Sequence, residues 1–161
     1  ISPGPLQSLD DRAEKRSLFL RLPLDDCLCM MAPSLWSSNL YSSLEPIPSD
    51  TLALWSSCVI AADHHDGLFV WSGHETVGAD HDAIRQNCVE FLNERAYNRF
   101  PMPELYMLSE GDSMSRRITA LLAPSHADPP EQQLVHFPAL ANLTPAELNA
   151  LREKFRFYDA S

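Results

Sequence analysis

The apolar and polar positions of this chain follow two periods, one typical of strands and one typical of helices. The short apolar runs CVIAAD and LFVWSG flank the turn-forming residues HHDG, which predicts a β-hairpin over residues 58–72. Residues 80–97 instead repeat apolar side chains at helical spacing, with two aspartates in the first turn, which predicts an amphipathic helix. A further strand is expected at 104–108 (ELYML).

The segments before this central pattern are less regular. Residues 1–17 are polar and contain proline and glycine, so we expect a linker or an extended arm there. The runs LFLRLP and DDCLCMMAP are typical of short strands, the second of which ends at Pro33. Residues 34–51 are rich in serine and proline and predict irregular chain that crosses a surface.

The C-terminal third predicts helices. Residues 113–123 (SMSRRITALLA) indicate a short helix, and residues 126–133 a loop. A final helix begins near Thr144, which fits an N-cap, while Pro145 takes the first helical position and Glu147 completes a capping box. The order strand, strand, helix, strand, short helix, long helix predicts an α+β layered domain.

The composition and net charge of the chain make some classes of binding partner unfavourable. The chain has 161 residues, of which 45% are hydrophobic, and a formal net charge of −10, so duplex nucleic acid and anionic membrane surfaces are disfavoured as partners. No apolar run is long enough to cross a membrane, and the N-terminus lacks the pattern of a signal peptide. Because the chain begins at Ile1 rather than at methionine, we expect a fragment of a longer protein.

No self-contained active site is evident. The sequence has no Gly-rich phosphate loop, no Gly-x-Ser-x-Gly elbow and no HExxH helix, so we expect neither an enzyme with its own substrate nor a bound cofactor. The run ADHHDG is rich in metal-ligating residue types, but neighbours in a tight turn point apart. A hairpin turn is therefore favoured over a zinc site.

Several motifs resemble one family. The run DHHDGLFVWSG (63–73) is similar to the hairpin of gelsolin-like domains, in which an aspartate closes one strand and the next strand ends aromatic-x-Gly. More specifically, RFPMP (99–103) resembles a motif in the C-terminal gelsolin-like domain of the larger, GTPase-activating subunit of the inner COPII coat. The runs MMAPSLWSSNL and HETV are also similar to segments of that family. The resemblance covers about residues 25–125 and, more loosely, the last helix.

The resemblance implies a fold and a function. The fold would be α+β, a gelsolin-like domain over 51–161 with a central mixed sheet flanked by helices, and residues 1–50 would be an extension or the end of a preceding domain. The function would be activation of the small coat GTPase of the Ras superfamily in ER-to-Golgi transport. Further partners would be the other inner and outer COPII coat subunits. The protein would be cytoplasmic, at ER exit sites, with only peripheral membrane association through the coat.

The resemblance also implies which residue acts, because the segment from RFPMP to Arg116 matches the family without a gap. It places Arg116 at the arginine finger that the family inserts into the active site of the GTPase, with Ser113 and Arg117 as neighbouring partner-binding residues. A guanidinium is always charged, and its planar fork of donors fits phosphate oxygens.

The same loop leaves alternatives open. It reads Gly-Asp-Ser where the family usually has Gly-Gly-Ser, and Arg117 stands where the family has an aromatic or apolar residue. Asp112 could hold Arg116, Arg117 could be the residue that reaches the nucleotide, or both arginines could be solvated. A non-catalytic interaction module is therefore the second hypothesis.

Two smaller expectations concern other positions. An actin-binding, calcium-regulated gelsolin domain is disfavoured, because the Gly-Asp pair of the family's usual calcium site reads Ser57-Cys58, and a thiol is a poor ligand for a hard cation. Arg99 of RFPMP is expected to cap the C-terminal end of the preceding helix.

Overall fold

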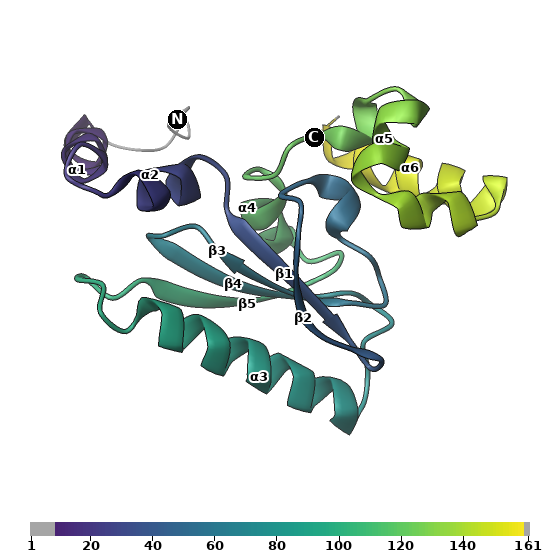
Figure 1. The fold of residues 1–161 in the computed structure, drawn as a ribbon, viewed down its shortest axis with the longest axis horizontal. Coiled ribbons are helices and arrows are strands. Elements are labelled where there is room, and N and C mark those ends of the chain that lie inside the picture. Colours follow the sequence, from purple (N-terminus) through teal and green to yellow (C-terminus); the bar gives the residue numbers. More distant parts are fainter. Residues whose placement is uncertain (1–8, 160–161) are drawn as a thin grey trace.

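The protein is built around one five-stranded mixed sheet with helices on both faces (Figure 1). The structure is a computed structural model that describes residues 9–159, with side chains for all of them except 9, 11, 152 and 155–159. The strands are β1 (Ser34–Asn39), β2 (Ser42–Ile47), β3 (Val59–Asp63), β4 (Gly67–Ser72) and β5 (Glu104–Ser109). The α-helices are α1 (Leu9–Phe19), α2 (Leu24–Met31), α3 (Ala79–Ala96), α4 (Arg116–Thr119), α5 (Pro130–His136) and α6 (Pro145–Asp159).

The sheet order is β2-β1-β3-β4-β5. The pairs β1–β2, β1–β3 and β3–β4 are antiparallel, whereas β5 pairs parallel to β4 after the crossover through α3. The predicted hairpin, the predicted long helix and the predicted strand at 104–108 are confirmed by β3, β4, α3 and β5. The α+β prediction with a mixed, helix-flanked sheet is confirmed as well.

The N-terminal predictions were wrong. The expected linker contains α1 from Leu9 onward, and the expected strand in DDCLCMM is the helix α2. Asp25 and Asp26 lie in the first turn of α2, where a helix dipole favours carboxylates. Residues 1–8 of the expected linker lie outside the described residues.

The segment expected to be irregular, 34–51, instead contains the hairpin β1–β2. Five residues of β1 pair with β3, from Ser34 opposite Asp63 to Ser38 opposite Val59. This pairing, rather than local propensity, makes a serine-rich segment a strand. The sheet therefore runs across the predicted boundary between residues 50 and 51, and the boundary itself stays a prediction.

Successive side chains of β3 and β4 point to opposite faces of the sheet, where they pack into two separate hydrophobic clusters. Ile60 and Trp71 face the cluster that includes η1 (Thr51–Ala53), α4 and the segment before α6, whereas Val59 and Val70 face the cluster beneath α3. Figure 1 shows α3 alone on one side of the sheet and α4, α5 and α6 on the other. Burial of strands on both faces explains why their sequences are continuously apolar.

The C-terminal segments partly follow the predictions. The expected short helix is a 3-10 turn, Ser113–Ser115, that leads into α4, and the expected loop at 126–133 contains the start of α5 at Pro130. The capping box of α6 is confirmed, because the Glu147 carboxylate accepts from the Thr144 N–H at 2.8 Å while Thr144 Oγ1 accepts from the Glu147 N–H at 3.3 Å. Between residues 9 and 159, none of the helices is both long enough and apolar enough to cross a bilayer.

Candidate functional site

The loop that carries Arg116 leaves the sheet at the end of β5 through a tight turn. The N–H of Asp112 donates to the carbonyl of Ser109 at 3.1 Å, and Gly111 has φ +87°, the value that the third position of a type II turn requires. A non-glycine residue would be strained at this position. The turn therefore directs the chain out of the sheet and back over its end.

The far side of the loop is held by buried groups. Ser115 is 2% exposed, and its hydroxyl donates to the carbonyl of Ser109. Ile118, two residues beyond Arg116, is fully buried in the cluster with η1 and α4. The segment 110–116 is thus fixed at both ends, while Asp112, Ser113 and Arg116 themselves are exposed.

The two arginines of the loop have different surroundings. The Arg117 guanidinium lies 4.6 Å from the ring centroid of Tyr106, a cation–π contact on β5. Arg116 is exposed at the first position of α4, and among the described residues its guanidinium has no hydrogen bond, ion pair or ring contact. The same holds for the Asp112 carboxylate, so no ion pair joins it to Arg116.

A cluster of four residues, here called the Glu110 cluster, closes the base of the loop: Glu110, Ser56, His74 and Lys154. The Glu110 carboxylate accepts from Ser56 Oγ at 3.0 Å and from the N–H of His74 at 2.9 Å, and its Oε2 lies 2.9 Å from His74 Nδ1. It also forms an ion pair with Lys154 of α6. The cluster joins the loop to segments that lie 36 and 54 residues away in sequence and to the last helix.

The surroundings of Glu110 favour the ionised form of its carboxyl group. Burial alone would raise the pKa of Glu110, but the hydrogen bonds from Lys154 and from the His74 N–H outweigh it and lower the pKa to about 2. Lys154 Nζ also donates to the carbonyl of Leu54 at 3.0 Å and lies 5.5 Å from the Trp71 ring centroid. Glu110 is therefore ionised at any physiological pH.

The opposite end of β4 and β5 carries a second ionic cluster. Arg99 of the RFPMP motif forms two hydrogen bonds to the fully buried carboxylate of Asp63, at 2.7 and 2.8 Å, so the prediction that Arg99 caps the helix end was wrong. Burial raises the pKa of Asp63, but the bonds from Arg99 and from the His65 N–H lower it below its usual value. Arg99 thereby joins the β3–β4 hairpin to the chain that follows α3.

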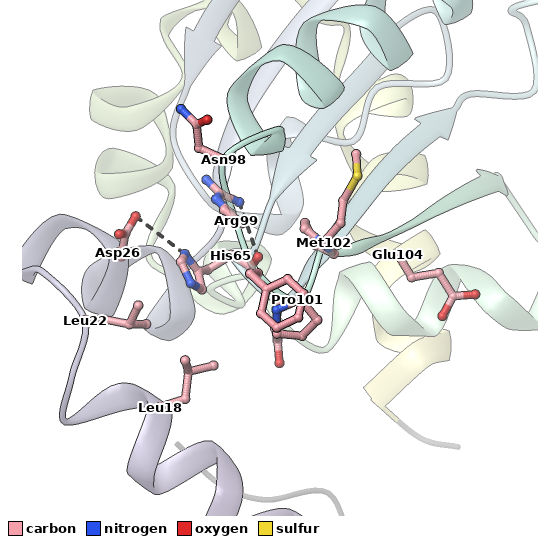
Figure 2. A pocket seen from close by; sticks show the side chains of 12 residues that line it. Leu18, Leu22, Asp26, His65, Asn98, Arg99, Pro101, Met102 and Glu104 are labelled. Atoms are coloured by element: carbon pink, nitrogen blue, oxygen red, sulfur yellow. Dashed lines mark hydrogen bonds and ion pairs between the residues drawn. The ribbon is translucent and has the colours of Figure 1, made fainter.

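A hollow of about 310 Å³ lies beside this second cluster, between α1–α2 and the RFPMP segment. Figure 2 shows Leu18 and Leu22 on one side of it, with Pro101 opposite and His65 pointing toward Asp26. His65 Nδ1 lies 3.5 Å from Asp26 Oδ1, a distance that suits an ion pair with a protonated ring but makes no hydrogen bond. Phe100 is 98% exposed at the rim.

The histidine-rich turn is a hairpin turn, as predicted. The N–H of His64 donates to the carbonyl of Gly67 at 3.0 Å, and His65 has φ +65°. Within the part of the chain that the structure describes, no three His, Cys, Asp or Glu side chains converge as a metal site would require. The expectation that calcium does not bind stays a prediction.

Sequence reasoning placed Ser113, Arg116 and Arg117 on one loop, and the structure brings them together at the end of the sheet. It missed the Glu110 cluster and the Asp63–Arg99 pair. Both connect residues more than 30 positions apart, so no local spacing marks them. Two sequence features could have pointed to them: the carboxylate of Glu110 shortly after a predicted strand, and Asp63 at the end of an apolar strand, where a buried charge needs a cationic partner.

Comparison with known proteins supports the fold and the family. Protein transport protein SEC23 A from Arabidopsis thaliana is 31% identical over 153 residues, which are 93% of this chain and 17% of that protein. The crystal structure of the human COPII-coat protein Sec24c aligns with a TM-score of 0.60 at 15% identity, covering 74% of this chain and 19% of that chain. The chain thus spans about a fifth of the length of either relative. A scan against protein-family models found no match.

Proposed function

We propose that this chain, which is a gelsolin-like domain of the inner COPII coat subunit family, belongs to a coat subunit that activates GTP hydrolysis by a small coat GTPase of the Ras superfamily. The residue that would act is Arg116, inserted in trans into the active site of the GTPase. The protein would be an activator and not an enzyme with its own substrate. The observation that carries the proposal is the exposed Arg116 guanidinium, without a partner among the described residues, on a loop anchored at both ends.

The chemistry of hydrolysis explains why an arginine would be needed. Negative charge shifts toward the bridging oxygen and the γ-phosphoryl oxygens in the transition state, and a guanidinium placed there stabilises it. An arginine supplied by an activating protein increases the rate on the order of 10³- to 10⁵-fold. The guanidinium must be available in the free activator, because an internal ion pair would have to be broken first.

The surroundings favour Arg116 over its neighbour. Arg117 is engaged with the ring of Tyr106, so moving it to a nucleotide would break a contact within the domain. Ser113 is exposed on the same loop and would contact the GTPase beside the nucleotide. Ser113, and Arg117 from its position on the Tyr106 ring, would contact the GTPase surface, while Arg116 would touch the reacting group.

The cellular setting follows from the same family. The subunit would act in the cytoplasm at ER exit sites, in ER-to-Golgi vesicle transport. It would assemble with other inner and outer COPII coat subunits and reach the membrane only through the coat. Residues 51–161 would form the gelsolin-like domain, and residues 1–50 an extension or the end of a preceding domain.

A non-catalytic interaction module is the second candidate. The exposed carboxylate of Asp112 favours it, because this group would approach the nucleotide phosphates together with Arg116 and repel them. In that case the domain would bind the GTPase or another coat subunit without accelerating hydrolysis.

Single-turnover GTP hydrolysis by the coat GTPase tests the proposal. The full-length protein is compared with its Arg116→Ala and Arg117→Ala variants at saturating concentration. We expect Arg116→Ala to lose about 10³-fold or more of the acceleration, whereas Arg117→Ala loses far less. Binding to the GTPase, measured separately, should persist in Arg116→Ala and should be weakened, but not abolished, in Arg117→Ala.

Two results would contradict the finger. One is a wild-type protein that binds the GTPase without accelerating hydrolysis, which would establish the interaction module. The other is full acceleration by Arg116→Ala. Asp112→Gly adds a matched comparison, because it should increase the acceleration if the carboxylate opposes the nucleotide.

A further inference from the structure

The segment 110–116, here called the Arg116 loop, is held in position mainly by contacts at its two ends. Residues 111–114 and 116 are exposed, so few buried contacts within the loop hold its path. The end nearest α4 is fixed by the fully buried Ile118, and the end nearest β5 is fixed by the Glu110 cluster. Segments with few buried contacts open readily unless their ends are restrained. The Glu110 cluster is thus one restraint on the arginine, beside the Asp112–Ser109 turn bond, the Ser115–Ser109 bond and the burial of Ile118.

Lys154 makes this restraint depend on the last helix. The Lys154 side chain is 20% exposed and the Glu110 side chain 10% exposed, so their ion pair lies largely out of water. Removing the Lys154 charge takes from the partly buried Glu110 carboxylate its strongest stabilising partner, which disfavours the original arrangement. The carboxylate would then turn toward solvent, and the hydrogen bonds to Ser56 and His74 would be lost with it.

We infer that Glu110 and Lys154 are positioning residues for Arg116, and that through them α6 is coupled to the loop. The consequence for hydrolysis rests on the proposed function, whereas the consequence for the loop does not. Glu110 and Lys154 touch neither nucleotide nor GTPase in this account. They hold the turn at Gly111 against the sheet, and the turn sets the direction in which α4 presents Arg116.

The inference predicts a specific kinetic pattern. Misplacing a catalytic group by about 1 Å can reduce a rate about 10²-fold without loss of binding. In full-length protein, Glu110→Gln and Lys154→Met should therefore lower the single-turnover rate at saturation by about 10- to 100-fold. The Kd for the GTPase in its ground state should change far less than the rate, because ground-state binding does not need the arginine at the reacting phosphate. Glu90→Gln, an exposed site on α3, is the matched control.

A double substitution shows whether the effect passes through Arg116. If Glu110 acts by positioning the arginine, adding Glu110→Gln to Arg116→Ala should reduce the rate no further. An equal reduction in both backgrounds would overturn the inference, because Glu110 would then act by another route. Lys154→Arg keeps the charge and should restore most of the rate that Lys154→Met loses.

Hydrogen exchange tests the loop without any GTPase. The hydrogen-bonded amides of Asp112 and Ser115 should exchange about tenfold faster in Glu110→Gln and in Lys154→Met than in wild type, because the turn opens more often, while β3 amides keep their protection. Unchanged exchange in both variants would overturn the inference. If wild type does not accelerate hydrolysis, the proposed function fails, and the exchange result alone decides whether the two residues position the loop.

Discussion

Arg99→Leu should destabilise the fold through the charge of Asp63. The Asp63 carboxylate is fully buried and accepts two hydrogen bonds from Arg99, whose side chain is 15% exposed. Leucine keeps much of the apolar stem and removes both donors. Each charge-assisted hydrogen bond contributes about 1.5 kcal/mol at the lower end of the usual range, so the loss is about 3 kcal/mol. The remaining donors, the His65 N–H at 2.9 Å and Arg95 Nε at 3.4 Å, keep the loss near this lower end.

Urea unfolding followed by tryptophan fluorescence measures this loss, because Trp71 is buried in the core. The pKa of Asp63 is lowered in the folded protein, so its contribution is present above the unfolded pKa of about 3.9 and is lost as the pH falls through the folded value. In Arg99→Leu the pKa of Asp63 should rise above its unfolded value, because burial of the carboxyl then outweighs the remaining donors. The difference in unfolding free energy between wild type and variant should therefore be largest near pH 7 and shrink toward pH 4.

Two outcomes would contradict a loss of stability caused by the charge of Asp63. A loss below about 1 kcal/mol at pH 7 would mean that the buried pair contributes no more than a surface pair. A loss that stays constant down to pH 4 would mean that packing, and not the charge of Asp63, is responsible. Arg21→Leu, at an exposed position, controls for the change in net charge and should leave stability within about 0.5 kcal/mol.

Three further predictions concern separate parts of the fold. Ile118→Ala should lower the unfolding free energy by about 3 kcal/mol in urea titration, since Ile118 is fully buried; a loss below about 1 kcal/mol would contradict its place in the core. Burial raises the pKa of the Cys88 thiol to about 11, so iodoacetamide at pH 8 should alkylate half-buried Cys58 well before Cys88, as peptide mass spectrometry would show, and equal rates would count against this. Thr144→Ala should destabilise α6 by about 1 kcal/mol, detected as an earlier loss of helical circular dichroism on heating. An unchanged melting curve would show that the capping box does not stabilise the helix.

The central elements could be predicted because their patterns are local. The hairpin 58–72 is two apolar runs around a turn, and α3 repeats apolar residues at helical spacing. The strand predicted in DDCLCMM is a helix in the structure. The prediction failed because an apolar segment of about eight residues is too short to show whether its period is that of a helix or of a buried strand. Asp25 and Asp26 behind Pro23 were the helix-start signal that could have decided it.

The remaining misses depend on distant partners. Strand β1 is rich in serine and becomes a strand because β3 and β2 pair with it on either side. The role of Glu110 depends on Lys154, 44 residues later in the sequence, and the role of Arg99 depends on Asp63. The position of Arg116 was predicted from the resemblance of its loop to a known family. Its exposure and the engagement of Arg117 with Tyr106 could only come from the packed structure.

The most direct test of the central claim compares binding to the GTPase in two nucleotide states. A transition-state analogue, GDP with aluminium fluoride, carries the charge that a finger would stabilise, whereas a non-hydrolysable GTP analogue represents the ground state. Full-length wild type should bind the first complex more tightly than the second by about 10²-fold or more, and Arg116→Ala should remove this preference while Arg117→Ala keeps it. Equal binding of both states by wild type, or a preference that survives Arg116→Ala, would contradict the assignment of Arg116 as the arginine finger.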